Sequence, residues 1–169
     1  MIKELTLLGV DPGSRATGFG VIHWSPGRLK HVNHGVILLD PKNSFNQRIS
    51  HLGSLFAEVL KRYQPHQVVI EKMFLGKNID SAFKLGHARG VIISEAGRQG
   101  ADIFEYSTRL VKKGITGSGA SSKEQVQAHL QLLLGVSIQQ LDASDALAMA
   151  CFQTFYLQKQ KLLERVKDQ

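Results

Sequence analysis

Three strand-like runs, separated only by short turns, open the chain and limit its possible folds more than any other feature. Residues 5–10, about 17–24 and about 29–39 are rich in Val, Ile, Leu and Thr. Between them lie Asp11-Pro-Gly-Ser14 and Ser25-Pro-Gly-Arg28, whose residue types favour tight turns. Because short turns join antiparallel neighbours, the sequence predicts a three-stranded antiparallel meander.

The middle of the chain alternates between helix-like and strand-like patterns. Apolar residues recur at helical spacing from about Ser44 to Tyr63, and Pro65 ends this pattern. Shorter apolar runs predict strands at 67–71 and 102–106, with a helix over about 79–98 between them. Strand–helix–strand steps favour parallel, right-handed crossovers, so these patterns predict an α/β fold.

The last third of the chain is predicted to be mainly helical. The glycine-rich segment Gly114–Ala120 is typical of a loop with unusual backbone angles or close approach to phosphate. Ser121-Ser-Lys-Glu124 offers a capping box for a helix that ends at Gly135. A final helix begins near Asp142 and extends past Leu157, with the tail beyond about 157 expected to fray.

Length and charge narrow the class of protein. The 169 residues are predicted to form a single domain, residues 1–169. A net charge of +7 favours a polyanionic partner, nucleic acid before an anionic membrane surface. No apolar run approaches the roughly 20 residues of a membrane span, and no signal peptide is recognised, so we expect a cytoplasmic protein without membrane contact. The single cysteine, Cys151, is interpreted as core filler.

Four acidic residues are the candidate site. Asp11 and Glu71 end two strand-like runs, which would place them side by side if those strands pair in parallel. Asp142 and Asp145 are three apart, so one helix face could carry both to the same point. Individually, Asp11 could be a turn residue, Glu71 a water-facing strand end, and Asp142 a helix N-cap with Asp145 as its partner. Considered together, the four carboxylates offer hard oxygen ligands, which favour Mg²⁺ or Mn²⁺. Two such ions can activate a water and stabilise the leaving oxygen of a phosphodiester.

These residues fall within motifs that resemble the RuvC family of bacterial Holliday junction resolvases. The resemblance covers about residues 6–152 in the family's order. Its motifs are Gly9-Val-Asp11-Pro-Gly-Ser-Arg-Ala-Thr-Gly-Phe-Gly-Val21, Ile70-Glu71-Lys-Met-Phe74 with Lys77-Asn78, Lys84-Leu-Gly-His-Ala-Arg-Gly90, Phe104-Glu-Tyr106, Lys123-Glu-Gln-Val-Gln127 and Asp142-Ala-Ser-Asp145-Ala-Leu-Ala148. The resemblance implies a ribonuclease H-like fold, with a five-stranded mixed sheet (three antiparallel and then two parallel strands) flanked by helices.

The resemblance also implies an activity and its residues. It implies a homodimer that resolves four-way DNA junctions by paired symmetric nicks in recombination and repair, leaving 5′-phosphate and 3′-hydroxyl ends. The catalytic, metal-binding residues would be Asp11, Glu71, Asp142 and Asp145, with two Mg²⁺ ions per subunit and Mn²⁺ as a substitute. Some family members have His at the position of Asp142. The RuvA–RuvB branch-migration complex would be a partner, and the protein would act at the nucleoid.

DNA contacts are assigned through the same resemblance. Phe74 matches an aromatic residue that stacks on junction bases, although it could instead be a core residue. Lys112 and Lys123 match lysines that contact DNA near the scissile phosphate, although both could be solvated surface residues. Lys77, in the second motif, is also assigned to DNA binding.

Other interpretations stay open on the sequence alone. A ribonuclease H that cleaves RNA–DNA hybrids would have a similar acidic site, and Asp11-Pro-Gly-Ser-Arg-Ala-Thr-Gly18 also resembles the phosphate loop of actin-like kinases. A non-enzymatic DNA-binding protein is a further alternative. Gly86 and Gly90 share a helix face that could pack on the sheet or on a dimer mate. His31 and His34, three apart in a strand, are expected on opposite faces and so make a poor metal pair.

Overall fold

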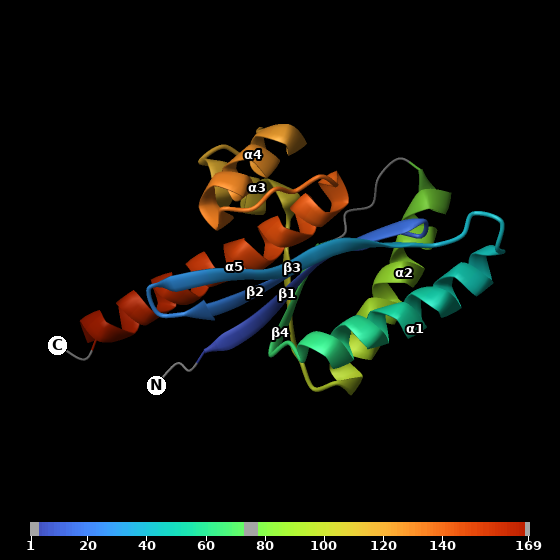
Figure 1. Ribbon diagram of the computed structural model, residues 1–169, viewed down its shortest axis with the longest axis horizontal. Coiled ribbons are helices and arrows are strands. Elements are labelled where there is room, and N and C mark those ends of the chain that lie inside the picture. Colours follow the sequence, from blue (N-terminus) through green and yellow to red (C-terminus); the bar gives the residue numbers. More distant parts are fainter. Residues whose placement is uncertain (1–3, 73–77, 168–169) are drawn as a thin grey trace.

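The computed structural model describes residues 4–72 and 78–167, which form a five-stranded sheet flanked by helices on both faces (Figure 1). Phe74 and Lys77 therefore lie outside the described residues. The sheet has the spatial order β3-β2-β1-β4-β5. Its strands are β1 (Leu5–Asp11), β2 (Ala16–Ser25), β3 (Arg28–Leu38), β4 (Gln67–Glu71) and β5 (Asp102–Tyr106).

Strand pairing confirms the predicted mixed sheet. The first three strands form an antiparallel meander, in which β1 pairs with β2 and β2 with β3. β4 then pairs in parallel with β1, and β5 in parallel with β4. The parallel pairs follow from the crossover helices, because a chain that returns through a helix re-enters the sheet in the same direction.

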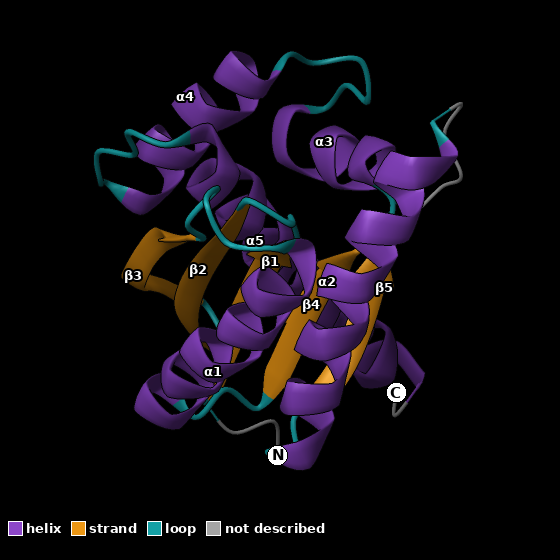
Figure 2. Cartoon of the chain, turned by 90° about the vertical axis from the view of Figure 1, so that its right-hand side faces the viewer, coloured by secondary structure: helices purple, strands orange, loops and turns teal. Residues whose placement is uncertain are grey.

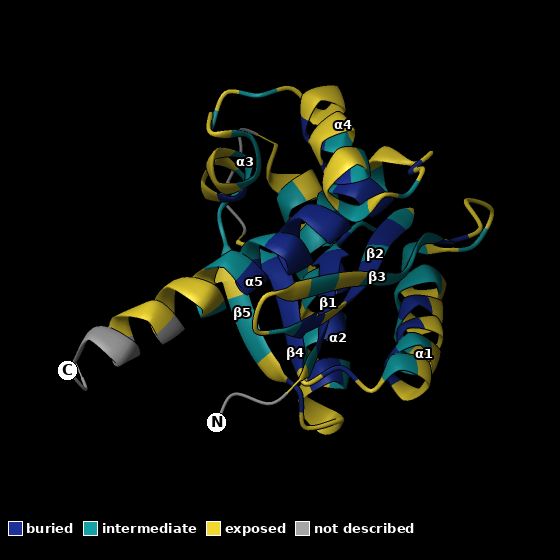
Figure 3. Ribbon diagram, turned by 60° about the vertical axis from the view of Figure 1, so that its left-hand side comes forward, coloured by how far each residue is buried: buried dark blue, intermediate teal, exposed yellow. Residues whose placement is uncertain are grey.

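Two helical layers cover the sheet. Helices α1 (Phe45–Tyr63) and α2 (Ile79–Arg98) lie on one face, and α5 (Leu141–Lys167) crosses the other with α3 (Thr108–Thr116) and α4 (Lys123–Leu134) beside it (Figures 1 and 2). Each layer has its own hydrophobic core, one around Phe56 and Ile92 and one around Trp24 and Leu147. Figure 3 shows that the buried residues lie between these layers, whereas the C-terminal part of α5 is exposed. Cys151 belongs to the second core, as expected, and burial raises the pKa of its thiol to about 12.

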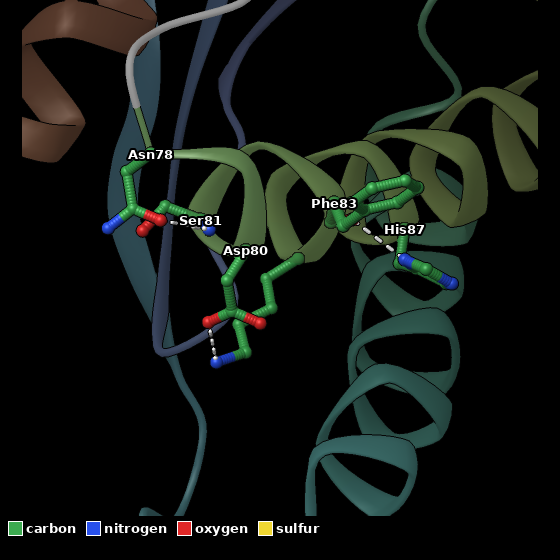
Figure 4. A network of polar contacts seen from close by, with 6 residues as sticks. Asn78, Asp80, Ser81, Phe83 and His87 are labelled. Atoms are coloured by element: carbon green, nitrogen blue, oxygen red, sulfur yellow. Dashed lines mark hydrogen bonds and ion pairs between the residues drawn. The ribbon is translucent and has the colours of Figure 1, made fainter.

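Local signals explain most helix ends. Ser44 and Gln47 form a capping box at the start of α1, and the residue after the helix, Gln64, has a left-handed φ of 43° just before Pro65. Gly135 ends α4 with a φ of 65°. The predicted box at Ser121–Glu124 is wrong by one residue, because Ser122 caps α4 and its partner is Gln125. The side chain of Asn78 caps α2 by accepting a hydrogen bond from the Ser81 amide (Figure 4).

The expectation of a loop over Gly114–Ala120 is wrong for its first three residues, because they belong to α3. Ser107 caps this helix by accepting a hydrogen bond from the amide of Leu110 at 3.3 Å. A Cβ added to Gly114 would lie 2.4 Å from the ring of Phe152 on α5. The glycine therefore permits close packing of α3 on α5, a tertiary requirement that outweighs its low helix propensity.

A β-bulge corrects the expectation for two histidines. Ile22 of β2 pairs with His31, but the next residue back, Val21, pairs with Asn33, so β3 has one extra residue here. The extra residue interrupts the alternation of side chains and brings His31 and His34 to the same face. Nε2 of His31 lies 2.8 Å from Nδ1 of His34. The expectation of opposite faces is wrong because it assumed unbroken alternation.

Gly90 on α2 and the lengths of the helices bear on what the surface of the protein can contact. A Cβ added to Gly90 would have no other atom within 4 Å among the described residues, so Gly90 does not serve close packing of α2 on the sheet. Within the ranges that the structure describes, no helix combines the length and the apolar character needed to cross a membrane.

Candidate active site

The register of β1 and β4 brings two of the candidate acids together. Val10 pairs with Ile70 in the parallel ladder, and the next residue on each strand is Asp11 or Glu71. Both carboxylates therefore leave the sheet at neighbouring carboxyl ends, where ligands of open α/β sheets commonly bind. The expected side-by-side placement of Asp11 and Glu71 is confirmed.

Polar contacts hold the turn that follows Asp11. The hydroxyl of buried Thr17 donates to the carbonyl of Gly13 at 3.0 Å and accepts from its amide at 3.2 Å. From α1, Nε of Arg48 donates to the carbonyl of Ser14 at 3.1 Å. These bonds tie the turn both to β2 and to the opposite helical layer, so they fix the end of β1.

Glycines in the sheet allow α5 to approach the same edge. A Cβ added to Gly9 would lie 1.8 Å from the carbonyl oxygen of Ala146, and one added to Gly18 would lie 2.0 Å from that of Asp142. Any side chain at these positions would push α5 away from the strands. The glycines of the first motif thus set the distance between α5 and the sheet, and with it the reach of Asp142 and Asp145.

Three of the four acids line one cavity of about 90 Å³ at the ends of the strands. Its acidic and basic residues come from β1, β4, α3, α4 and α5. The lining consists of Asp11, Glu71, Thr108, Val111, Lys112, Lys123, Val126, Asp145, Ala148 and Met149. The structure therefore brings together two of the predicted DNA-contacting lysines and three of the predicted metal ligands.

Asp142 occupies a different position from the other three acids. It does not line this cavity, and it lies in the first turn of α5, which begins at Leu141. The alternative that Asp142 is the N-cap residue is wrong, because the helix already includes it. Asp142 is close enough to contribute to the raised pKa of Asp11.

Protein donors already contact two of the cavity carboxylates. Lys123 on α4 forms an ion pair with the carboxylate of Asp145 on α5. The hydroxyl of Thr108, the first residue of α3, donates to Oε1 of Glu71. Lys112 instead donates to the carbonyl of Ser121 at 2.8 Å, which fastens the segment that leads into α4.

Two side chains of the cavity have shifted pKa values. Burial, with the nearby charges of Asp145, Glu71 and Asp142, raises the pKa of Asp11 to about 7, and Lys123 opposes this shift. Burial alone would lower the pKa of the Lys123 ammonium, but its hydrogen bond to Asp145 and the charges of Asp145, Asp11 and Asp142 outweigh this and raise the pKa. The cavity thus concentrates negative charge that calls for a cation.

The donor chemistry fits a hard divalent cation. Three carboxylates face the cavity, and none of the Cys or His side chains that the structure describes lines it, as Mg²⁺ and Mn²⁺ sites prefer. Among the described residues, no group of three or more His, Cys, Asp or Glu side chains is arranged to hold a metal ion. Lys123 is paired with Asp145, so a bound ion would compete with this lysine, whereas the hydroxyl of Thr108, which bonds Oε1 of Glu71, can orient that carboxylate for an ion at its other oxygen.

Sequence reasoning missed two residues that contact the candidate acids. Thr108 follows Ser107 at the start of α3, a helix that was not predicted, so nothing connected its hydroxyl with Glu71. Arg89 on α2 donates from Nε to the main-chain carbonyl of Glu71 at 3.3 Å and forms an ion pair with Glu105. The small residues of the Gly86–Gly90 segment indicate helix packing, and no pattern in the sequence connects this arginine with Glu71.

Comparisons with known proteins agree with this geometry. The family model "Crossover junction endodeoxyribonuclease RuvC" matches residues 7–153. The chain is 59% identical over 163 residues to the RuvC of Bdellovibrio bacteriovorus, covering 96% of this chain and 97% of that protein. It is 42% identical over 147 residues to the RuvC of Geotalea uraniireducens, covering 86% of each.

A solved structure extends the likeness to three dimensions. The structure of "T. thermophilus RuvC in complex with Holliday junction substrate" is similar, with a TM-score of 0.84 and 27% sequence identity, and the match covers 92% of this chain and 96% of that one. The residues that the family model matches include all four candidate acids, Asp11, Glu71, Asp142 and Asp145. The chain therefore belongs to the crossover junction endodeoxyribonuclease RuvC family.

Proposed function

We propose that this protein is a divalent-metal-dependent endonuclease that resolves four-way DNA junctions by paired, symmetric nicks. The observation that carries the proposal is the cavity itself. In it, Asp11, Glu71 and Asp145 converge from three elements and two lysines stand beside them. An anionic substrate suits a chain of net charge +7, and membership of the RuvC family supports a junction as that substrate.

In this proposal the carboxylates of Asp11, Glu71 and Asp145 hold the metal, and Asp142 assists from the first turn of α5. Bound Mg²⁺, or Mn²⁺ in its place, would make hydroxide available from water near neutral pH and neutralise charge on the leaving 3′-oxygen, most effectively as a pair of ions. The resulting ends are a 5′-phosphate and a 3′-hydroxyl. The carboxylates crowd one another, and a bound metal ion would relieve this repulsion more fully than Lys123 alone.

The basic residues of the proposal act on the DNA. Lys123 and Lys112 line the cavity, where their ammonium groups can attract the phosphate on either side of the cut. Lys123 would exchange its bond to Asp145 for a phosphate oxygen once metal neutralises that carboxylate. Phe74 is proposed to stack on an unpaired base at the junction, worth about 1–3 kcal/mol, with Lys77 on the nearby backbone.

The assembly follows from the substrate. A four-way junction has approximate two-fold symmetry, so a homodimer with C2 symmetry would present two equivalent sites to strands of like polarity. Such a dimer would act in recombination and repair at the nucleoid, in the cytoplasm, together with the RuvA–RuvB branch-migration complex. A Cβ added to Gly90 would meet no other atom within 4 Å among the described residues, so this part of α2 has room for contact with a partner.

The test is a mapped cleavage assay on a mobile four-way junction with Mg²⁺. Wild type should cut two strands of like polarity at symmetric positions, Asp11→Asn should not cut, and junction binding by Asp11→Asn in EDTA should stay within about twofold. Asp142→Asn should lose activity if Asp142 assists the metal. Equal cutting of an RNA–DNA hybrid, or parallel loss of binding and cutting in Asp11→Asn, would contradict the proposal.

A further inference from the structure

Arg89 joins three elements beneath the candidate active site. It lies on α2, which packs against β5 beside β4 (Figure 2). Its Nε donates to the main-chain carbonyl of Glu71 at 3.3 Å, and its Nη2 forms an ion pair with the carboxylate of Glu105 on β5. The Arg89 side chain is only 18% exposed and that of Glu105 is 39% exposed, so the guanidinium is more shielded from solvent than its partner.

These contacts meet at the point where the sheet ends. Glu71 is the last residue of β4 and pairs with Tyr106, and the amide of Lys72 donates to the Tyr106 carbonyl at 2.8 Å. The Glu71 carbonyl accepts a hydrogen bond from Arg89, so the guanidinium holds the final peptide of the strand. Among the described residues, the β4–β5 ladder ends with the pair of Glu71 and Tyr106.

Glu71 is thereby held at two levels. Arg89 holds its main chain from the side of α2, and Thr108 holds its carboxylate from the side of the cavity. A shift of the main chain at Glu71 would move its carboxylate relative to Asp11 and Asp145, which belong to other elements. Metal ligands depend on such outer contacts, because a cation demands its oxygens within narrow limits of distance and direction.

We propose that Arg89 is a positioning residue for the cleavage reaction, fixing the end of β4 so that the Glu71 carboxylate enters the cavity where it can bind metal. This inference rests on the proposed role of Glu71. Arg89 acts through Glu71 and through Glu105, which orients the guanidinium from β5. The fork of the guanidinium suits this task, because one planar group reaches two acceptors on two strands at once.

Arg98 provides a matched control on the same helix. It also pairs with a glutamate, Glu95, but it is the last residue of α2 and its side chain is 75% exposed. Replacing either arginine by Met removes one positive charge and one ion pair and keeps an unbranched side chain. Arg89 and Arg98 variants therefore differ mainly in the contact with β4 and β5.

The experiment makes two measurements on each variant. Calorimetric titration gives its affinity for Mn²⁺ without DNA, and single-turnover assays give its rate of junction cutting. The variants are Arg89→Met, Arg89→Lys, Glu105→Gln and Arg98→Met. Arg89→Met should weaken Mn²⁺ binding by about 10-fold or more, the range found for outer contacts of metal ligands. The Mg²⁺ concentration for half-maximal cutting should rise by a similar factor, with junction binding in EDTA within about twofold of wild type. The Mn²⁺ affinities of Arg89→Lys and Glu105→Gln should lie between those of wild type and Arg89→Met. The affinity of Arg98→Met should match that of wild type.

Specific outcomes would overturn the inference. They are Mn²⁺ binding by Arg89→Met within twofold of wild type, or an equal loss in Arg98→Met. If Arg89→Met does not fold, Arg89→Lys and Glu105→Gln decide, and unchanged Mn²⁺ binding in both rejects the inference. Glu71→Gln distinguishes a failure of the proposed role of Glu71 from a failure of the role of Arg89. If Glu71→Gln still binds Mn²⁺ and cuts, the proposed role of Glu71 fails; if it loses both while the Arg89 variants do not, only the positioning role fails.

Discussion

The ammonium group of Lys123 on α4 is paired with the carboxylate of Asp145 on α5, inside the cavity that Asp11 and Glu71 also line. This pair places a protein cation at the point where the proposed mechanism needs a metal cation. Lys123 is thus a counterion of the acids in the free protein as well as a candidate contact of the DNA. The two roles connect the stability of the protein with its metal binding.

The first prediction concerns this pair. In EDTA, Lys123→Met should lower the free energy of unfolding by about 1–3 kcal/mol, because Asp145 is largely buried and would lose its bonded partner. Saturating Mg²⁺ should stabilise the variant more than wild type, since the ion replaces the missing charge. Chemical denaturation with and without Mg²⁺ measures both effects. Lys84→Met, which removes an exposed pair with Asp80 (Figure 4), should cost no more than about 0.5 kcal/mol.

The second prediction is a dependence of stability on pH through Asp11. Its pKa rises from 3.8 to about 7 in the folded protein, so the folded state keeps a proton that the unfolded state has released. Stability from this group is complete below about pH 4, falls as pH rises to about 7, and is constant above that. The loss should be on the order of 4 kcal/mol, at about 1.4 kcal/mol for each pKa unit.

Denaturation in EDTA at several values between pH 4 and pH 8 measures this effect. Asp11→Asn has no proton to lose at this position, so its stability should decline less than that of wild type over the same range. Parallel curves for the two proteins would show that Asp11 titrates in the folded state as it does in the unfolded chain. Mg²⁺ should flatten the wild-type curve, because a bound cation favours the ionised carboxylate.

The third prediction concerns the hydroxyl that contacts Glu71. Thr108→Val preserves the shape of the side chain but removes its hydrogen bond to Oε1 of Glu71. We expect about 10-fold weaker Mn²⁺ binding and a corresponding loss of cutting at limiting metal, with Thr108→Ser close to wild type. Thr154→Val is the control, because that hydroxyl bonds within α5 to the carbonyl of Cys151. Similar metal affinities for Thr108→Val and wild type would contradict the prediction.

The fourth prediction concerns the close approach of α5 to the sheet. Gly9→Ala should destabilise the protein by about 1–3 kcal/mol or more, because the three nearest atoms to the added Cβ are all backbone atoms of α5 and cannot rotate away. The added Cβ of Gly97→Ala in α2 would meet no described atom within 4 Å outside its own helix backbone, so this variant should stabilise the helix by up to about 1 kcal/mol. Thermal denaturation of the two variants gives the comparison, and equal effects would exclude the packing explanation.

Local patterns predicted most of the elements. The turns at Asp11–Ser14 and Ser25–Arg28 and the apolar runs around them gave the meander, and the helix–strand alternation after Ser44 gave the parallel strands. These predictions succeeded because turn chemistry and apolar periodicity act between residues close in the sequence. The predictions failed at Gly114–Thr116, where packing on Phe152 permits a helix. They also failed at His31 and His34, where a bulge places both side chains on the same face of the sheet.

The candidate site divides in the same way. The sequence by itself determined which carboxylates end β1 and β4 and which two begin α5, because each is defined by its own strand or helix. Only the tertiary structure decided that Asp145 enters the cavity beside Lys123, that Asp142 does not line it, and that Thr108 and Arg89 hold Glu71. The physical reason is that these contacts join different elements, and their geometry depends on how closely α5, α3 and α2 pack on the sheet.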